Sequence, residues 1–375
     1  MSMVVKNNMS AVSTLNTLNK NSSALASSLK KVSSGMKINS AADDASGYAI
    51  SERMRVQIRG LDQANQNTQN GTSMMKVAEG AVSSTVDILK TLKEKVINAA
   101  NDTNTDADRA TIQKELDQSI DQINDNANVT YNGKYLVDGS HNSKVTATTT
   151  ALTNESLGKD TTSATVFSAM TDRNGNSLNI QASDTITMSV VKEGKTSTFS
   201  VHGSDKLSDL VKCSGDLDDA KIDSGSTIGS DVAGDTVGTA DKGNAITIHA
   251  KEGAVAGQIS GLTFSVTNTK GQVQKSANAV LDNFTESIRA QNKSDDNAIN
   301  LQVGTKANQS IRVGLTDMRA EALGLQSSKG ETIQIGTQVQ ANAAVNVLDN
   351  AVQKALDQQT TIGSVQSACP TRQAT

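Results

Sequence analysis

Apolar residues recur at alternating spacings of three and four along two stretches of the first hundred residues. The first stretch contains Leu15, Leu18, Ser22, Leu25, Leu29, Val32 and Met36. The second stretch contains Met75, Ala78, Val82, Thr85, Leu89, Leu92, Val96 and Ala99. This rhythm places a narrow apolar seam along a helix and is typical of a coiled coil.

A boundary between these two helices is predicted near residue 39. Gly35 is suited to end the first helix, and Ser40 with Asp43 three residues later predicts a capping box for the second. A helix from about 40 to 100 would be ~90 Å long at 1.5 Å per residue. Such a helix is rare in compact enzymes and common in proteins that assemble.

A polar break at 101–106 separates the long helix from a third one. The apolar side of the third helix comprises Ile112, Leu116, Ile120, Ile123 and Ala127. Residues 129–137 then predict a β-hairpin, because Asn132-Gly133 supplies the two positive φ angles of a type I′ turn.

The composition shifts to Thr, Ser, Gly, Asp and Lys between about 141 and 276. Short alternating runs there predict strands, with a turn at Glu193-Gly194. The apolar positions of these runs are Ile186, Met188 and Val190, then Phe199 and Val201, then Ile246 and Ile248, and last Leu262, Phe264 and Val266. We therefore expect a β-rich inserted domain with long loops, in which 213–243 stays unassigned.

Helical periodicity returns near 277 with Val280, Phe284 and Ile288, and it strengthens toward the C-terminus. The second run is Ala341, Ala344, Leu348, Ala351, Ala355, Gln358, Ile362 and Val365. Helices on both sides of the insert must therefore meet. The predicted fold class is α+β, mostly α: a long coiled-coil-like helical rod formed by both chain ends, with the β-rich insert projecting sideways. The predicted limits are 1–39 for an N-terminal helical arm, 40–140 and 277–367 for the rod core, 141–276 for the insert and 368–375 for an atypical tail.

The composition of the 375-residue chain excludes several kinds of function. It has 3 Tyr, 4 Phe and no Trp, so aromatic walls for a ligand pocket and stacking platforms for single-stranded nucleic acid are scarce. The net charge of −4 provides no basic field for phosphate backbones. No apolar run approaches the ~18–20 residues that span a bilayer. We expect no nucleic-acid partner and no membrane insertion.

No catalytic or metal-binding motif emerges from the side chains. Gly194-Lys195-Thr196 lacks the upstream glycine of a phosphate-binding loop, so a hairpin turn explains it better. The three histidines, His141, His202 and His249, lie far apart and form no HExxH pair. Cys213 and Cys369 form neither a disulfide framework nor a CxxC zinc motif. We expect no enzymatic activity, no cofactor and no metal.

Two segments carry motifs that identify a family. The N-terminal motif is Leu29-Lys-Lys-Val-Ser-Ser-Gly-Met-Lys-Ile-Asn-Ser40-Ala-Ala-Asp-Asp-Ala-Ser-Gly47, continued by Ile58-Arg-Gly-Leu-Asp-Gln-Ala-Asn-Gln-Asn. The C-terminal motifs are Asn342-Ala-Ala-Val-Asn-Val-Leu-Asp-Asn-Ala and Ile362-Gly-Ser-Val-Gln366. These segments closely resemble bacterial flagellin, and the resemblance covers about 1–140 and 277–367.

The resemblance implies a structural subunit of the flagellar filament, which serves motility and self-assembles through its terminal helices. The implied partners are other flagellin subunits, the flagellar type III export apparatus, and filament cap and junction proteins. The implied location is the extracellular filament, reached without a cleaved signal peptide; the N-terminus indeed shows no such peptide. The seam residues expected to serve assembly are Leu15, Leu18, Leu25, Leu29, Val32, Leu89, Leu92, Val96, Leu348 and Ile362. The alternative is an intramolecular core, which is favoured for the 75–99 run and stays open for the 15–36 run.

The last residues depart from the flagellin pattern. The family continues well past Ser367 with a long helix, whereas here Ala368-Cys-Pro-Thr-Arg-Gln-Ala-Thr375 follows, and Pro370 ends the heptad pattern. The sequence therefore indicates a flagellin truncated or frameshifted after about residue 367, with impaired assembly. The alternative function is a non-polymerising, secreted flagellin-like binding protein or the product of a damaged flagellin gene. An enzyme within the insert is the weakest hypothesis.

The resemblance also bears on immune recognition. Many flagellins bind Toll-like receptor 5 through an Arg and a Leu on the helix that corresponds to about 87–101, with a Glu on the following helix. Here Thr91 takes the Arg position, Lys95 takes the Leu position, and Glu115 matches the Glu. Threonine cannot make the forked hydrogen bonds of a guanidinium, and burying an unpaired ammonium group is costly. We expect weak or absent receptor binding.

Overall fold

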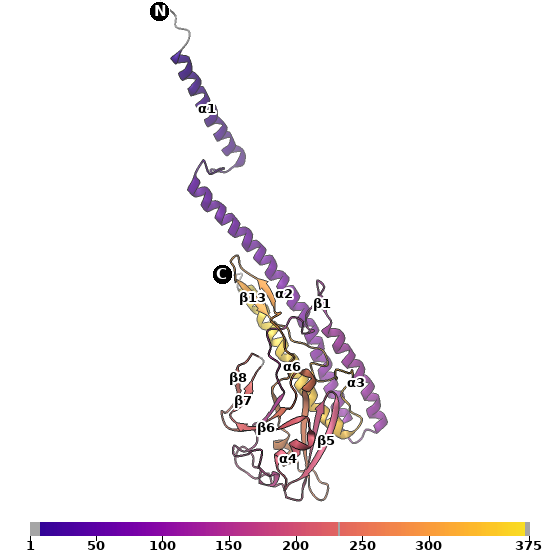
Figure 1. Ribbon diagram of the computed structural model, residues 1–375. Coiled ribbons are helices and arrows are strands. Elements are labelled where there is room, and N and C mark those ends of the chain that lie inside the picture. The colour runs from indigo at the N-terminus through magenta and orange to yellow at the C-terminus, as the bar shows by residue number, and fades with distance from the viewer. Residues whose placement is uncertain (1–7, 232, 372–375) are drawn as a thin grey trace, which may run out of the picture. The chain divides into compact units, whose positions relative to one another are not determined.

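The computed structural model describes residues 8–231 and 233–371, which divide into two units (Figure 1). The first unit comprises residues 8–67 and 302–309. The second comprises 68–301 and 310–371. The long helix α2 (Ala45–Ala99) supplies residues to both units.

The helix α1 (Met9–Ser34) begins and ends as local side-chain chemistry dictates. The side chain of Asn8 accepts a hydrogen bond from the Ala11 backbone N–H at 3.2 Å. Gly35 ends the helix in the left-handed region, with φ 67°, as the sequence predicts. Glycine is favoured there because it has no Cβ to clash with the backbone.

The predicted capping box at Ser40 and Asp43 is wrong. Asp43 Oδ2 accepts hydrogen bonds from the Asn39 and Ser40 backbone N–H groups, both at 3.1 Å, and so closes a turn before the helix. These hydrogen bonds hold the pKa of Asp43 below its usual value. The helix α2 starts at Ala45, where Asp44 Oδ1 accepts from the Gly47 N–H at 3.0 Å. Asp44, rather than Ser40, therefore acts as the cap of this helix, since its side chain accepts from an amide of the first turn.

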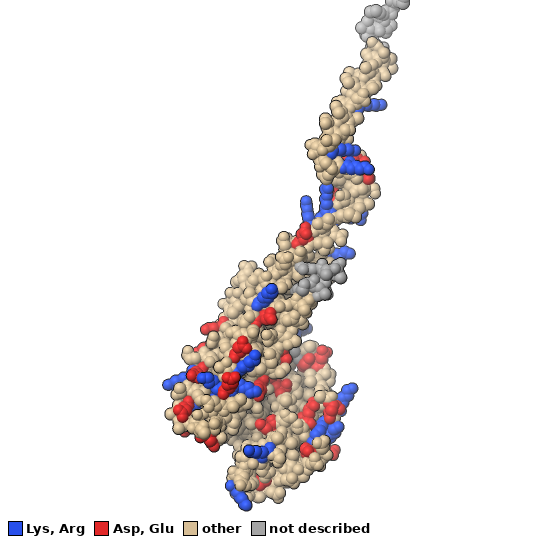
Figure 2. Space-filling view, turned by 180° about the vertical axis from the view of Figure 1, so that it is seen from behind, with Lys and Arg blue, Asp and Glu red and all other residues tan. Residues whose placement is uncertain are grey.

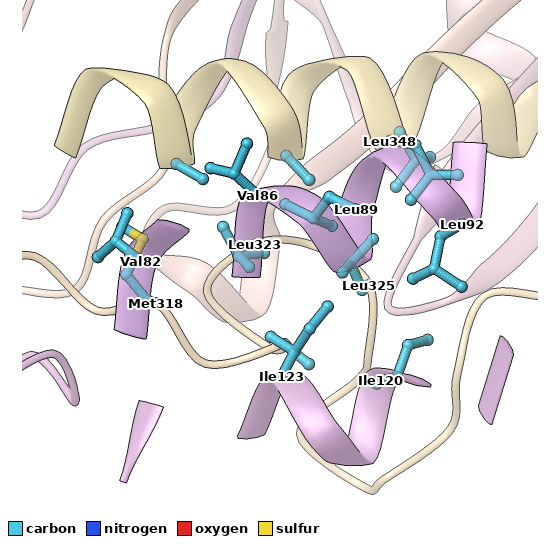
Figure 3. Close-up of a cluster of buried hydrophobic side chains, with 14 of the residues drawn as sticks. Val82, Val86, Leu89, Leu92, Ile120, Ile123, Met318, Leu323, Leu325 and Leu348 are labelled. Atoms are coloured by element: carbon cyan, nitrogen blue, oxygen red, sulfur yellow. The ribbon is translucent and has the colours of Figure 1, made fainter. Parts of the chain in front are cut away.

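In the second unit, α2 packs with α3 (Asp106–Ala127) and α6 (Gln338–Thr371) around an apolar core. Figure 3 shows side chains from the three helices and from the loop between Met318 and Leu325 meeting in this core. Buried Arg109 joins α2 to α3 by donating from Nε to the Ala99 carbonyl at 2.9 Å. The predicted apolar side of α3 is confirmed, since Leu116, Ile120, Ile123 and Ala127 are buried.

The hairpin predicted at 129–137 is confirmed by β1 (Thr130–Tyr131) and β2 (Lys134–Tyr135). Asn132 and Gly133 have φ of 50° and 76°, as a type I′ turn requires.

The strands of the predicted insert form two principal sheets. One has the order β10-β4-β5, and the other has the order β11-β3-β9-β6. The strand bounds are β3 (Ala151–Asn154), β4 (Thr185–Lys192), β5 (Lys195–His202), β6 (Leu217–Gly225), β9 (Ala245–Ala250), β10 (Ile259–Thr267) and β11 (Thr285–Ile288). The alternating runs that the sequence indicates all lie in these strands, and the β4–β5 turn falls at Glu193-Gly194 as predicted.

The described chain also contains smaller elements. They are α4 (Leu207–Ser214), α5 (Lys275–Leu281), the pairs β7 (Thr227–Ser230) with β8 (Thr236–Gly238) and β12 (Ile299–Gln302) with β13 (Ser310–Val313), and the short 3₁₀ turns η1 (Phe167–Ala169) and η2 (Val255–Gly257). The segment 213–243, which the sequence leaves unassigned, contains β6, β7 and β8.

One edge of β10 pairs with β4, and the backbone groups of its other edge form hydrogen bonds with side chains. These side chains come from α5, from α6 and from Asp282 just beyond α5. Asn346 and Asn350 of α6 donate to the carbonyls of Leu262 and Ser260 at 3.2 and 3.0 Å. Asp282 Oδ1 accepts from the Phe264 N–H at 2.9 Å, and Asn278 accepts from the next exposed amide, that of Val266. Buried backbone groups need such partners, and a covered edge is also protected from pairing with another chain.

One further prediction is wrong. The helix near 277 ends at Leu281, and Ile288 lies in β11, which pairs with β3. From 282 to 337 the chain forms strands and loops rather than helix. At the other end, α6 runs through Thr371, one residue beyond Pro370. A proline near a helix terminus removes one backbone donor and leaves the preceding turns intact.

The predicted fold class is confirmed, with long helices from both parts of the chain and a β-rich region between them. The predicted domain limits at 39, 140 and 276 stay predictions. Residues 1–7 of the predicted arm and 372–375 of the predicted tail lie outside the described residues.

Candidate assembly surface

One row of large apolar side chains on α1 is exposed to solvent. Leu15, Leu18, Leu25, Leu29 and Val32 are 59–80% exposed, and α1 has no buried residue. The helix contains Lys20, Lys30 and Lys31 but no acidic residue, and Figure 2 shows it largely free of charged side chains on the visible face. Single exposed leucines are ordinary, but a contiguous apolar row marks an interaction surface.

A second exposed row lies on the first part of α2. Its members are Ile50, Met54, Ile58 and Leu61, which are 44–60% exposed. Val56 is also exposed but lies on another side of the helix. Sequence reasoning missed these residues. The spacing of Ile50, Met54, Ile58 and Leu61, by four, four and three, was the signal that could have found them. Together with the α1 row, they form what we call the open apolar face.

The other five predicted seam residues lie inside the second unit. Leu89, Leu92, Val96, Leu348 and Ile362 are at most 2% exposed and belong to the core shared by α2, α3 and α6. These residues stabilise the fold of one subunit. This burial agrees with the intramolecular alternative for the 75–99 run, and a role of these residues in assembly stays a prediction.

Thr91, Lys95 and Glu115, which align with the receptor contacts of other flagellins, interact with other groups of this chain. Lys95 Nζ lies 2.5 Å from Glu115 Oε2, so the two side chains form an ion pair between α2 and α3. Thr91 Oγ1 donates to the Asp87 carbonyl of its own helix at 3.0 Å. The sequence did not predict the ion pair, because it depends on how two helices are aligned.

Residues 8–231 and 233–371 contain no group of three or more His, Cys, Asp or Glu placed to hold a metal ion. His249 Nε2 lies 3.2 Å from Asp223 Oδ2, and His141 Nδ1 lies 3.4 Å from the Asn297 carbonyl oxygen. In the described part of the chain, no helix combines the length and the apolar content that crossing a membrane requires.

The chain matches known proteins most strongly over its first helices. The family model described as the bacterial flagellin N-terminal helical region matches residues 5–142. A flagellin of Clostridium tyrobutyricum is 28% identical over 366 residues, which are 97% of this chain and 85% of that protein. This chain belongs to the bacterial flagellin family. The resemblance that the terminal motifs indicate is thus confirmed.

Two other similarities each cover a smaller share of this chain. A flagellin of Bacillus subtilis (strain 168) is 44% identical over 142 residues, which are 37% of this chain and 47% of that protein. Among solved structures, flagellar hook associated protein-3 of Legionella pneumophila has 17% identity and a TM-score of 0.36, covering 86% of this chain and 93% of that one. A score of this size adds nothing to the assignment. The family match contains both rows of the open apolar face.

Proposed function

We propose that this flagellin is a structural subunit of the flagellar filament that assembles by burying its open apolar face against other subunits. The observation that carries the proposal is the exposed leucine row of α1, a helix without one buried residue. A helix of this kind gains most of its stability from packing its apolar face.

The magnitude of this burial suits a cooperative assembly. Burying the five α1 side chains would contribute roughly 8–15 kcal/mol, at about 1.5–3 kcal/mol each. Association itself costs an estimated 4–15 kcal/mol or more in lost freedom and ordering. One pairwise contact through α1 is therefore marginal, and a subunit held by several neighbours at once is stable.

We also propose the finer features that the family resemblance implies. The partners are other copies of this chain, filament cap and junction proteins, and the type III export apparatus. The location is the extracellular filament, reached without a cleaved signal peptide. The role is structural rather than enzymatic, which agrees with the family to which the chain belongs.

Seeded polymerisation tests the assembly proposal. Purified protein is added to short filament seeds, and elongation is followed by sedimentation and electron microscopy. The variant Leu18→Ser, Leu25→Ser, Leu29→Ser should raise the critical concentration more than tenfold, because a loss of 1.4 kcal/mol is already tenfold. The matched control Asn16→Ser, Ser23→Asn, Ser27→Asn changes three residues on the opposite side of the same helix and should elongate normally.

Two outcomes would contradict the proposal. Elongation of the leucine variant at the normal critical concentration would show that the α1 row is not the contact. Failure of the unchanged chain to elongate seeds would match the impaired assembly expected from residues 368–375. It would favour the alternative of a non-polymerising flagellin-like binding protein.

We further propose that this flagellin binds Toll-like receptor 5 weakly or not at all. The support is that Lys95 and Glu115 form an ion pair with each other and that the Thr91 hydroxyl donates to a backbone carbonyl of its own helix. In a cell reporter assay, Thr91→Arg with Lys95→Leu should partly restore signalling. The control Lys90→Leu, which removes a neighbouring exposed charge, should not. Strong signalling by the unchanged chain would refute the proposal.

A further inference from the structure

A polar cavity of about 480 Å³ lies within the second unit and contains no residue of the open apolar face. Its walls come from the loops 138–142, 291–297 and 316–322 and from Lys354 of α6. The volume falls within the range of roughly 300–1,000 Å³ that is usual for small-molecule sites.

Lys354 is the most buried charged residue in the cavity wall, with 6% of its surface exposed. Its Nζ donates to the Ala322 carbonyl oxygen at 2.6 Å. An ammonium group has three hydrogens to donate. Within the described residues, the Ala322 oxygen accepts one of these hydrogens. The other two hydrogens remain for a molecule in the cavity. Leaving such donors unsatisfied is costly.

The cavity wall carries equal numbers of acids and bases. They are Asp138, Asp295 and Asp317 against Lys293, Arg319 and Lys354. A wall without net charge gives no overall attraction to a ligand of either sign, whereas a ligand that carries both charges can place each of them beside an opposite one. It favours a neutral molecule that carries both signs.

The existing ion pairs show which groups are available. Arg319 and Asp317 bind each other, with Nη2 and Oδ2 at 2.6 Å. Asp138 Oδ1 accepts from the Ser140 hydroxyl at 2.6 Å. The Asp295 carboxylate, by contrast, has no hydrogen-bond or ion-pair partner in the part of the chain that the structure describes. Among the described residues Lys293 also has no such partner, but it is exposed, whereas Lys354 is the buried cation of the wall. We therefore take Lys354 and Asp295 as the cation and the anion that receive a ligand.

We propose that this cavity binds a small zwitterion of the amino-acid type. The carboxylate of the ligand accepts the two remaining hydrogens of the Lys354 ammonium group, and the ligand's own ammonium group binds Asp295. Charge-assisted hydrogen bonds of this kind are about twice as strong as neutral ones. The site is independent of the open apolar face, so it stands or falls separately from filament assembly.

The surroundings of Lys354 make the binding depend on pH. Burial lowers the pKa of Lys354 to about 8, with Arg289 acting in the same direction and with Glu286 and Asp317 opposing it. Glu286 of β11 is itself buried and ion-paired to Arg289 at 3.2 Å. Since the anchor is the protonated amine, affinity should fall as pH rises through about 8.

Calorimetric titration of the full chain tests the site, with thermal unfolding as a second measurement. The probes are the common free L-amino acids one at a time, with acetate and methylamine as ligands of one charge only. At least one amino acid should bind saturably and raise the melting temperature. Acetate and methylamine should bind at least tenfold more weakly. The affinity for the amino acid should decrease between pH 7 and 9.

Variants connect the binding to the named residues. Lys354→Met and Asp295→Asn should each weaken binding at least tenfold, whereas Lys270→Met and Asp235→Asn, at exposed positions outside the cavity, should leave it unchanged. Lys354→Arg should keep the affinity nearly constant between pH 7 and about 8.5, because a guanidinium stays charged and the ligand's own ammonium group still holds its proton there. Asp295 is exposed, so its variant tests the site even if Lys354→Met fails to fold.

Three results would overturn the proposal. One is the absence of binding by every amino acid at 10 mM. Another is acetate binding as tightly as the best amino acid, which would indicate a plain anion site. The third is unchanged binding in both Lys354→Met and Asp295→Asn.

Discussion

The two parts of α2 have similar apolar spacing and opposite environments. In residues 45–67, Ile50, Met54 and Ile58 are exposed, whereas in residues 68–99, Met75, Val82 and Leu89 are fully buried. The second part has α3 and α6 as partners in its own unit. The first part shares its unit with α1 and the short segment 302–309, and only Ala64 is buried there. Apolar periodicity therefore specifies which face seeks a partner, and the presence of a partner in the same chain decides whether that face becomes core.

The comparison separates two kinds of stability in one helix. Burial of the second part contributes to the free energy of unfolding of a single subunit. Burial of the first part is available only to an assembly. Mutations with the same chemistry should consequently have different effects in the two parts.

The largest expected effect comes from truncating a leucine in the buried part. Leu89→Ala should lower the free energy of unfolding by about 2–5 kcal/mol, because it removes packed methyl groups and leaves a cavity. Ile58→Ala in the exposed part should change it by no more than about 0.5 kcal/mol in the unassembled protein. Urea unfolding followed by circular dichroism measures both. Equal effects would show that the two parts do not differ as described.

The next effect concerns pH. Burial raises the pKa of Asp282, beside β10, to about 6 from 3.8. A carboxyl with a raised folded pKa stabilises the fold fully below pH 3.8, and that contribution is lost as pH rises through about 6. The loss should reach about 3 kcal/mol. Asp282→Asn keeps an oxygen acceptor for the Phe264 N–H and should remove this pH dependence. A wild-type stability profile with no fall between pH 4 and 7 would contradict the prediction.

In the first unit, a carboxyl group should change stability with pH in the opposite direction. Hydrogen bonds from Asn39 and Ser40 lower the pKa of exposed Asp43. Its contribution to the turn before α2 should be present above pH 3.8 and be lost as pH falls through the lowered pKa. Chemical shifts of Ser40 and Asp43 across pH 2–5 measure this. Titration of Asp43 at or above 3.8 would show that the turn is not formed.

A smaller effect distinguishes two glycines within α2. A Cβ added at Gly80 meets no atom within 4 Å, so Gly80→Ala should stabilise the helix by up to about 1 kcal/mol through backbone entropy alone. A Cβ at Gly60 would lie 2.9 Å from Thr305 Cγ2, so Gly60→Ala should gain less or nothing. Urea unfolding of the two variants decides between them, and an equal gain would contradict the close approach of Thr305.

The smallest effect is expected for the ion pair between α2 and α3. Lys95→Met should cost less than about 1 kcal/mol, because Lys95 and Glu115 are both substantially exposed and water screens their attraction. The cost should shrink further in 1 M salt. A cost as large as that of Leu89→Ala would show that the pair is more deeply buried than the structure indicates.

The sequence by itself determined the features that depend on neighbouring residues. The helical spans of α1, α2 and α3 and of the strictly periodic part of α6 follow from apolar spacing, and Gly35 and Asn132-Gly133 mark a helix end and a turn through backbone geometry. The leucine row of the candidate assembly surface was visible in the same spacing. These features need no information about distant parts of the chain, since local sterics and the period of the helix specify them.

Only the tertiary structure decided which apolar faces are covered and which polar groups meet. Val280, Phe284 and Ile288 have helical spacing, yet Thr285–Ile288 forms β11 because pairing with β3, more than 130 residues earlier, satisfies its backbone. Leu29 and Leu89 look alike in the sequence, and only packing against α3 and α6 buries the second. Lys354 lies among strict heptads and becomes part of a polar cavity because three loops close around it. In each case the deciding interaction joins residues far apart in the chain, which local spacing cannot encode.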